Sequence, residues 1–174
     1  KDKGIYNAFN KALSHLKGDY VLFLNSGDYL ISETTIEEVL KHLDDSVIIY
    51  GDHMLVGDKK FVNLGGVNIT VHSNELVTTF QGFPDKVDDA YFRTNALPHQ
   101  STFIKCDYMK EHPYSEDYRI IGDWKLLREA IVVDKVKYKH IPVTVSSFAL
   151  DGISSTQSNI GIEEINDYYK TIDK

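Results

Sequence analysis

The spacing of apolar residues predicts a chain that alternates between helices and strands. Apolar side chains from Ile5 to Leu16 recur with helical spacing, which indicates an amphipathic helix that ends before Gly18. An apolar run at residues 20–24 follows, with turn-forming residues on both sides. Such a run is typical of a strand buried on both faces, as in a parallel sheet covered by helices.

The same alternation continues to the end of the chain. Further helices are predicted at residues 36–43, 106–112, 123–133 and 160–172. Further strands are predicted at residues 46–50, which end at Gly51-Asp52, and at 100–104, 136–140 and 143–148, the last two as a pair around Pro142. The remaining segments predict a hairpin or irregular antiparallel strands within 53–70, a short helix at 74–80, a long loop near the site at 81–98 and a loop at 152–159. This order favours a single α/β domain.

The beginning of the chain has an unusual organisation. A helix followed at once by a buried strand is the second half of a βαβ unit, and no first half precedes it. We therefore expect residues 1–174 to form one domain that is incomplete at its N-terminus. A sheet without its neighbouring strands would present an unpaired edge, so self-association through that edge is expected.

Composition narrows the class of protein. The chain has 42% hydrophobic and 26% charged residues, as ordinary globular proteins do. Its net charge of −7 argues against a nucleic-acid partner, which would require a basic surface. The single cysteine, Cys106, excludes a disulfide framework and favours a reducing, cytoplasmic location.

The polar segment from Asn25 to Asp28 follows the first apolar run. It places three oxygen-bearing side chains around a glycine, on the kind of loop where open α/β sheets bind ligands. Mg²⁺ often takes only one or two carboxylates together with the oxygens of a substrate diphosphate. One interpretation is therefore a metal–diphosphate site centred on Asp28. The other is a turn that ends the strand, because these residue types form turns in any protein.

Two further positions are candidates for chemistry. Asp123 falls in the first turn of a predicted helix, where the helix dipole and free amides stabilise a carboxylate. It is interpreted either as a plain cap or as a general base for an acceptor hydroxyl. His99, just before a predicted strand, is either a ligand-binding or a structural histidine. The other histidines lack HxH or HExxH spacing, which argues against a zinc hydrolase.

Four blocks of the sequence carry a family resemblance. Residues 2–12 (DKGIYNAFNKA) and 18–28 (GDYVLFLNSGD) closely resemble the central block of family 2 glycosyltransferases of the kind that build bacterial cell-surface polysaccharides. The likeness continues in order through YGD at 50–52, PHQSTF at 98–103, GDW at 122–124 and GISS at 152–155. The resemblance implies a GT-A fold, a Rossmann-like mixed sheet flanked by helices, of which this chain would be the C-terminal two-thirds.

The resemblance also implies roles for individual residues. Asp28 matches the last carboxylate of the family's DxD-type motif, which holds Mn²⁺ or Mg²⁺ on the donor diphosphate, and Asn25 stands where many members have aspartate. Asp123 matches the catalytic base. The other residues matched to donor binding are Asp2, Lys3, Asn10, Ser154 and Ser155, and those matched to sugar or acceptor binding are His99, Gln100 and Trp124.

The implied function is an inverting transfer of a hexosyl group from a nucleotide-diphospho-sugar, foremost a UDP-sugar, to a saccharide or lipid-linked acceptor. The location expected for it is the cytoplasm or the inner face of the membrane. Because the family's nucleotide-holding βαβ segments are missing, this chain alone is expected to bind donor poorly. The alternatives are a non-catalytic GT-A-like binding module, favoured by Asn25, and a metal-dependent nucleotidyltransferase of similar architecture.

Overall fold

The computed structural model describes residues 2–64 and 67–173, with the backbone alone at 58–64, 67–76 and 153–154. The strands are β1 (Tyr20–Val21), β2 (Tyr29–Leu30), β3 (Ile48–Leu64), β4 (Val67–Gln81), β5 (Thr102–Lys105) and β6 (Tyr138–Ala149). The helices are α1 (Ile5–Leu13), α2 (Thr35–Leu40), α3 (Asp89–Phe92), α4 (Cys106–Glu111), α5 (Gly122–Arg128), α6 (Ile153–Thr156) and α7 (Ser158–Ile172). A 3₁₀ turn at His99–Ser101 precedes β5, and a π turn at Glu129–Val133 extends α5.

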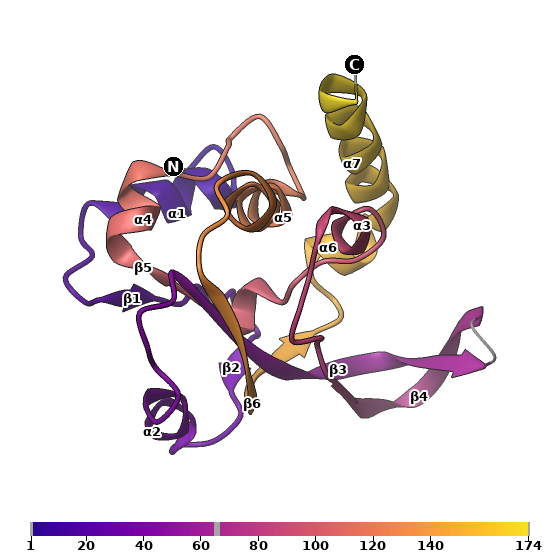
Figure 1. The fold of residues 1–174 in the computed structure, drawn as a ribbon. Helices are drawn as coiled ribbons and strands as arrows, with labels where there is room; N and C mark the ends of the chain where they lie inside the picture. Colours follow the sequence, from indigo (N-terminus) through magenta and orange to yellow (C-terminus); the bar gives the residue numbers. More distant parts are fainter. Residues whose placement is uncertain (1, 65–66, 174) are drawn as a thin grey trace.

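Within the described residues the strands form a 6-stranded sheet in the order β1-β5-β3-β6-β2, with β4 paired to β3. The central strand β3 is antiparallel to β5 and parallel to β6, and β6 is antiparallel to β2. Helices α1, α4 and α5 lie over one face of the sheet and α2 over the other (Figure 1). The predicted mixed sheet flanked by helices is therefore confirmed.

Residues at the start of β3 contribute side chains to the two apolar clusters that lie on opposite faces of the sheet. Ile48 and Tyr50 pack into the larger apolar cluster, which includes Trp124, whereas Ile49 packs on the opposite face with Val39 and other residues. Side chains of a strand point alternately to its two faces, so an unbroken apolar run is what a strand between two helical layers requires. The prediction of a buried strand here is confirmed.

The C-terminal helix belongs to the same core. In α7, Tyr168 and Tyr169 are buried and meet the Trp124 ring edge-on, with ring centroids 5.4 and 5.8 Å away. Edge-to-face pairs of this kind add to the stabilisation that comes from burial alone. Helix α7 is thereby fixed against α5.

The first strand differs from its prediction. β1 covers only residues 20–21 of the apolar run, pairs antiparallel with β5, and lies at one end of the strand order. Leu24 is exposed, while Phe23 packs on Phe9 of α1 at 4.4 Å between ring centroids. The strand is shorter than predicted and antiparallel to its neighbour rather than parallel, although the run does pack on both faces, with Val21 and Phe23 in the larger apolar cluster and Tyr20 and Leu22 against the smaller one. Self-association through the β1 edge stays a prediction.

Four other segment predictions are also wrong. Residues 74–80 are part of β4 instead of a helix, because pairing with β3 prevails over the local pattern. β3 does not end at Gly51-Asp52, and residues 136–148 give one strand, β6, in place of a pair. The register between β3 and β6 shifts between Tyr50, opposite His140, and Asp52, opposite Thr144, so Pro142 lies at an irregularity of the ladder, where proline is tolerated. The loop predicted at 152–159 contains α6 and the start of α7.

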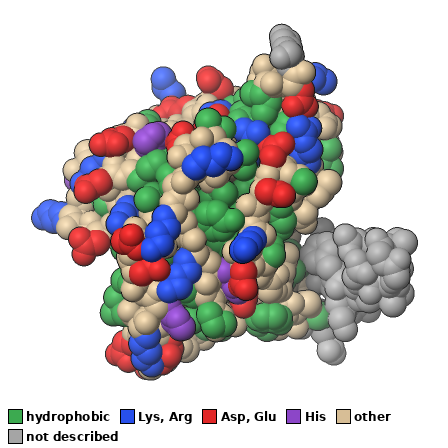
Figure 2. All heavy atoms as spheres, in the orientation of Figure 1, with side chains coloured by type: hydrophobic (Ala, Val, Ile, Leu, Met, Phe, Trp, Pro, Cys, Tyr) green, Lys and Arg blue, Asp and Glu red, His purple; other side chains and the backbone are tan. Residues whose placement is uncertain are grey.

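The surface gives two general observations. On the face shown in Figure 2, acidic and basic side chains are interspersed, with apolar side chains between them. Within the described ranges, no helix has both the length and the apolar composition needed to cross a membrane.

Candidate functional site

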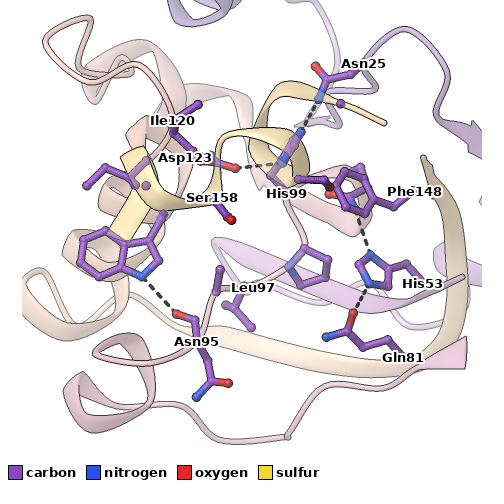
Figure 3. A pocket seen from close by; sticks show the side chains of 18 of the residues that line it. Asn25, His53, Gln81, Asn95, Leu97, His99, Ile120, Asp123, Phe148 and Ser158 are labelled. Carbon is purple, nitrogen blue, oxygen red and sulfur yellow. Dashed lines mark hydrogen bonds and ion pairs between the residues drawn. The ribbon is translucent and has the colours of Figure 1, made fainter. Parts of the chain in front are cut away.

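A cleft of about 1050 Å³ gathers residues from distant parts of the sequence. It is lined by the segment after β1, the loop that follows β4, the start of α5, and the region of α6 and α7 (Figure 3). The loop at 81–98 was expected near the site, and it contributes Phe83 and Leu97 among other residues. Of the residues matched by resemblance, seven contribute to the lining: Asn25, Asp28, His99, Gln100, Asp123, Trp124 and Ser155.

A chain of hydrogen bonds crosses the cleft. Asp123 Oδ1 accepts from the Tyr6 hydroxyl at 2.8 Å, and Asp123 Oδ2 lies 2.9 Å from His99 Nδ1. The Asn25 amide donates from Nδ2 to His99 Nε2 at 3.0 Å (Figure 3). When the ring is neutral, this arrangement places its proton on Nδ1, which faces the carboxylate. The two predicted centres, Asn25 and Asp123, are thus joined through His99.

The charge of Asp123 is set by these partners. Burial raises the pKa of a carboxyl group, but the His99 charge and the hydrogen bonds from His99 and Tyr6 outweigh it and leave the pKa of Asp123 below its usual value. The converse holds for His99: burial lowers its pKa, but the hydrogen bond and charge of Asp123 raise it overall. Asp123 is therefore ionised at neutral pH, which is the form that a general base requires.

Asp28 presents an unpaired oxygen. Gly27 before it adopts a φ of +98°, a left-handed conformation that glycine takes without strain, so the turn can place the carboxylate in the cleft. Asp28 Oδ1 accepts from the Ala149 amide at 3.1 Å, while Oδ2 is buried and has no partner among the described residues. Burial accordingly raises the pKa of Asp28, although its hydrogen bonds oppose the shift. A buried carboxylate oxygen without a donor is a good position for a cation.

The residues around Asp28 fit a divalent cation that is shared with a ligand. Within the described part of the chain, no group of three or more His, Cys, Asp or Glu side chains forms a complete metal site. Mg²⁺ and similar ions are often held by one or two carboxylates plus substrate phosphate oxygens. Because the Asn25 amide nitrogen faces His99, its carbonyl oxygen is the atom left for a cation. Asp28 and Asn25 can therefore hold such an ion only together with oxygens from a ligand.

A second polar cluster forms the wall beside Asp28. His53 is buried, and burial lowers its pKa, so the ring is neutral. Its Nε2 donates to Gln81 Oε1 at 2.7 Å, and its Nδ1 accepts from Gln100 Nε2 at 3.0 Å. Phe148 stacks on the ring with an interplanar angle of 7°. Gln100 is therefore fixed by His53, a residue that the sequence pattern did not single out.

The remaining matched residues divide into two groups. Trp124 is among the residues that line the cleft, and its indole N–H is already bonded to the Phe92 and Asn95 carbonyls. Ser155 also lines the cleft, and Ser154 lies in α6 with its side chain outside the described residues. The described lining does not include Asp2, Lys3 or Asn10.

Those three residues have other contacts. Asp2 pairs with Lys11 at 2.7 Å, and the Asn10 side chain holds the Tyr114 backbone at 2.8 and 2.9 Å. The Lys3 amide donates to Asn7 Oδ1 at 3.2 Å. Donor binding by Asp2, Lys3 and Asn10 stays a prediction.

Sequence reasoning also missed an anchor for the helix that carries Asp123. The Glu164 carboxylate, from α7, accepts the backbone N–H groups of Arg119, Ile120 and Ile121 at 2.7, 3.0 and 3.1 Å. These amides immediately precede α5, so Glu164 satisfies donors that would otherwise lack a helical partner. No local motif reveals the contact, because it spans more than forty residues of sequence.

We expect Glu164→Gln to lower the free energy of unfolding by about 2 kcal/mol, since hydrogen bonds to a charged group contribute more than neutral ones. Glu163→Gln, at an exposed neighbouring position of the same helix, is the matched control and should stay within about 0.5 kcal/mol. Urea unfolding of both variants measures the difference. Equal values for the two variants would show that Glu164 is not an anchor.

Gly122 allows Tyr6 to reach Asp123. A Cβ atom at Gly122 would lie 2.6 Å from the Tyr6 ring, closer than packed atoms approach. Gly122→Ala should therefore displace the ring, destabilise the protein by about 1–3 kcal/mol and reduce turnover together with stability. Gly18→Ala, where the nearest atom is at 3.5 Å, should be nearly neutral in thermal unfolding. A neutral Gly122→Ala would show that Tyr6 is not held as described.

Comparison with known proteins adds the family context. The sequence profile described as Glycosyl transferase family 2 matches residues 1–109. Curated relatives from Mycobacterium bovis and Mycobacterium tuberculosis are each named PGL/p-HBAD biosynthesis glycosyltransferase. Each is 24% identical over 161 residues, an alignment that covers 89% of this chain and 55% of the relative. The chain thus spans about half the length of the curated relatives it matches.

Proposed function

The chain belongs to glycosyl transferase family 2, and from that premise we propose that its cleft carries an inverting glycosyl transfer from a nucleotide-diphospho-sugar to an acceptor hydroxyl in glycoconjugate synthesis. The observation that supports this most is the ionised Asp123, joined through His99 to Asn25 in the cleft that also holds the unpaired Asp28 oxygen. In this proposal, Asp123 acts on the attacking hydroxyl and Asp28 acts at the leaving diphosphate.

Asp123 is proposed as the general base. It takes the proton of the acceptor hydroxyl while that oxygen attacks the anomeric carbon of the donor sugar. The new carbon–oxygen bond forms on one face as the bond to the diphosphate breaks on the other, and its electron pair leaves with the diphosphate oxygen. Tyr6 and His99 hold the carboxylate in place and keep it ionised. A positioned base typically contributes about 10²- to 10⁴-fold to the rate.

Asp28 and Asn25 are proposed to hold Mn²⁺ or Mg²⁺ against the donor diphosphate. When bound, such an ion offsets the negative charge that develops on the leaving group. The buried Oδ2 of Asp28 supports this role, because the structure gives it no donor among the described residues. His53, Gln81 and Gln100 form the adjoining polar wall, in which His53 and Gln100 are buried and bonded to each other while the side chain of Gln81 is exposed and can bond to a ligand hydroxyl.

The proposal is tested by the products. The full-length protein, as its gene encodes it, is incubated with radiolabelled nucleotide sugars, a divalent cation and candidate acceptors. We expect nucleoside diphosphate to be released mole for mole with glycosylated acceptor. Release of pyrophosphate would instead indicate a nucleotidyltransferase. Binding of nucleotide sugar without any turnover would favour a non-catalytic module. Asn25 in place of an aspartate supports this alternative hypothesis.

A further inference from the structure

We infer that His53 is a positioning residue for donor specificity: it holds the Gln81 amide so that the amide nitrogen faces the cleft and donates a hydrogen bond to an oxygen of the donor sugar. The inference rests on the proposed function, which assigns the donor diphosphate to Asp28. Both ring nitrogens of His53 are already bonded, so His53 acts on the sugar only through Gln81.

The hydrogen bonds of His53 fix the orientation of the Gln81 amide. A glutamine oxygen can only accept a hydrogen bond, and a glutamine nitrogen can only donate one. His53 Nε2 lies 2.7 Å from Gln81 Oε1, and His53 Nδ1 lies 3.0 Å from Gln100 Nε2, so the neutral ring carries its proton on Nε2. The Gln81 oxygen is therefore engaged, while its nitrogen has no partner among the described residues.

The His53 ring is itself held in one orientation. It is buried, Phe148 stacks on it, and Phe83 meets it edge-on with ring centroids 5.1 Å apart. The backbone of Gln81 is also fixed, because Gln81 is paired with His53 in the β3–β4 ladder. An exposed glutamine normally loses rotamer freedom when a ligand orders it. Here much of that loss precedes binding, which favours a role in recognition.

The Gln81 amide lies near the proposed diphosphate site. Burial lowers the pKa of His53, and the negative charge of Asp28 is among the influences that oppose this shift, so the two side chains are close together. Figure 3 shows the Gln81 nitrogen directed away from His53. Because the sugar of a donor is bonded directly to its diphosphate, it lies within reach of groups that adjoin Asp28. A neutral amide donor suits a hydroxyl or carbonyl oxygen of that sugar.

Calorimetric titration of the full-length protein measures the contact. UDP-glucose, UDP-galactose, UDP-N-acetylglucosamine and GDP-mannose are each compared with their own nucleoside diphosphate in the presence of Mn²⁺. Gln81→Met keeps the length of the side chain and removes the donor. We expect it to weaken binding of the preferred nucleotide sugar about 3- to 10-fold and to leave nucleoside diphosphate binding unchanged. Equal effects on the two ligands, or no effect on either, would overturn the inference.

Thr78→Met is the matched control on the same strand. Thr78 is exposed, pairs with Val56 and is not among the described lining residues. Its substitution should change neither affinity. If Thr78→Met weakened nucleotide-sugar binding as much as Gln81→Met, the effect would belong to the strand and the inference would be wrong.

Two variants of His53 separate positioning from a purely structural role. His53→Phe keeps a ring between Phe83 and Phe148 but has no nitrogen, whereas His53→Gln can still donate an N–H to Gln81. Both variants leave the buried Gln100 without its partner, so both should lower stability. We expect His53→Phe to weaken nucleotide-sugar binding as Gln81→Met does, and His53→Gln to retain most of the affinity. Equal losses would show that His53 is only structural.

The tautomer of His53 is a readout that a change in stability does not mimic. In the protein labelled with ¹⁵N-histidine, the His53 signals are assigned by their absence from the spectrum of His53→Phe. We expect a neutral ring that is protonated on Nε2 at neutral pH. A proton on Nδ1 would mean that the Gln81 amide is reversed, with its oxygen toward the cleft, and would overturn the inference.

These results are separable from the proposed function. An unsubstituted protein that binds none of the nucleotide sugars would overturn the proposed function and this inference with it. Sugar transfer by a protein whose Gln81→Met variant keeps full affinity would leave the function standing and overturn the inference alone. Selective loss of nucleotide-sugar binding by Gln81→Met, in a protein that transfers no sugar, would support the inference and overturn the transfer.

Discussion

Asp123→Asn lowers the turnover of the full-length protein about 10²- to 10⁴-fold, because an amide cannot take the proton of the acceptor hydroxyl. The substitution keeps the size of the side chain and an oxygen that can still accept from Tyr6. The loss should therefore be seen in kcat rather than in the amount of folded protein. Initial rates of nucleoside diphosphate release, together with circular dichroism, distinguish the two.

Asp117→Asn is the matched control for this prediction. Asp117 is an exposed carboxylate a few residues upstream, outside the described lining of the cleft, and its substitution should leave turnover unchanged. Turnover of Asp123→Asn within threefold of the unsubstituted protein would contradict the assignment of the base. Asp123 would then be no more than a partner that orients His99.

Asp28→Asn should remove the divalent-cation dependence of nucleoside diphosphate binding and weaken that binding about 30-fold or more. The loss of one partner from a close charge pair typically costs about 2 kcal/mol or more. The asparagine oxygen can still accept from Ala149, so the turn is preserved. Calorimetric titration with UDP, in the presence and absence of Mn²⁺, measures both quantities.

Stability provides a second readout for the same variant. In the absence of metal, Asp28 is a partly buried carboxylate with one unpaired oxygen, which is unfavourable. Asp28→Asn should therefore be as stable as the unsubstituted protein, or more stable, when metal is absent. Asp107→Asn, at a position whose side chain is 97% exposed, should change neither binding nor stability. Unchanged Mn²⁺-dependent binding by Asp28→Asn would contradict the proposed site.

Much of this site was predictable from short segments. Asn25, Asp28, His99 and Asp123 were singled out by residue type and by their place at the ends of predicted strands or at the start of a helix. The structure brings all four into one cleft. The local sequence was sufficient to predict these positions because turns and helix N-termini are specified by residues that are close together in the chain.

The partners of these residues were not predictable in the same way. Tyr6 reaches Asp123 across 117 residues of sequence, and Gln100 meets His53 across 47. Such contacts depend on how the helices pack against the sheet, and the periodicity of apolar residues in the sequence does not reveal that packing. The same limit explains the helix predicted at residues 74–80, where pairing with β3 prevailed over the local pattern.

The central claim is that Asp123 acts on the acceptor while a separate site holds the donor diphosphate, and one titration tests this most directly. Full-length Asp123→Asn protein is titrated with UDP in the presence of Mn²⁺, beside the unsubstituted protein. If Asp123 acts on the acceptor alone, the variant that no longer transfers sugar binds UDP with the same affinity. A loss of UDP affinity that parallels the loss of turnover would show that Asp123 belongs to the donor site or to the stability of the fold, and the proposed mechanism would be wrong.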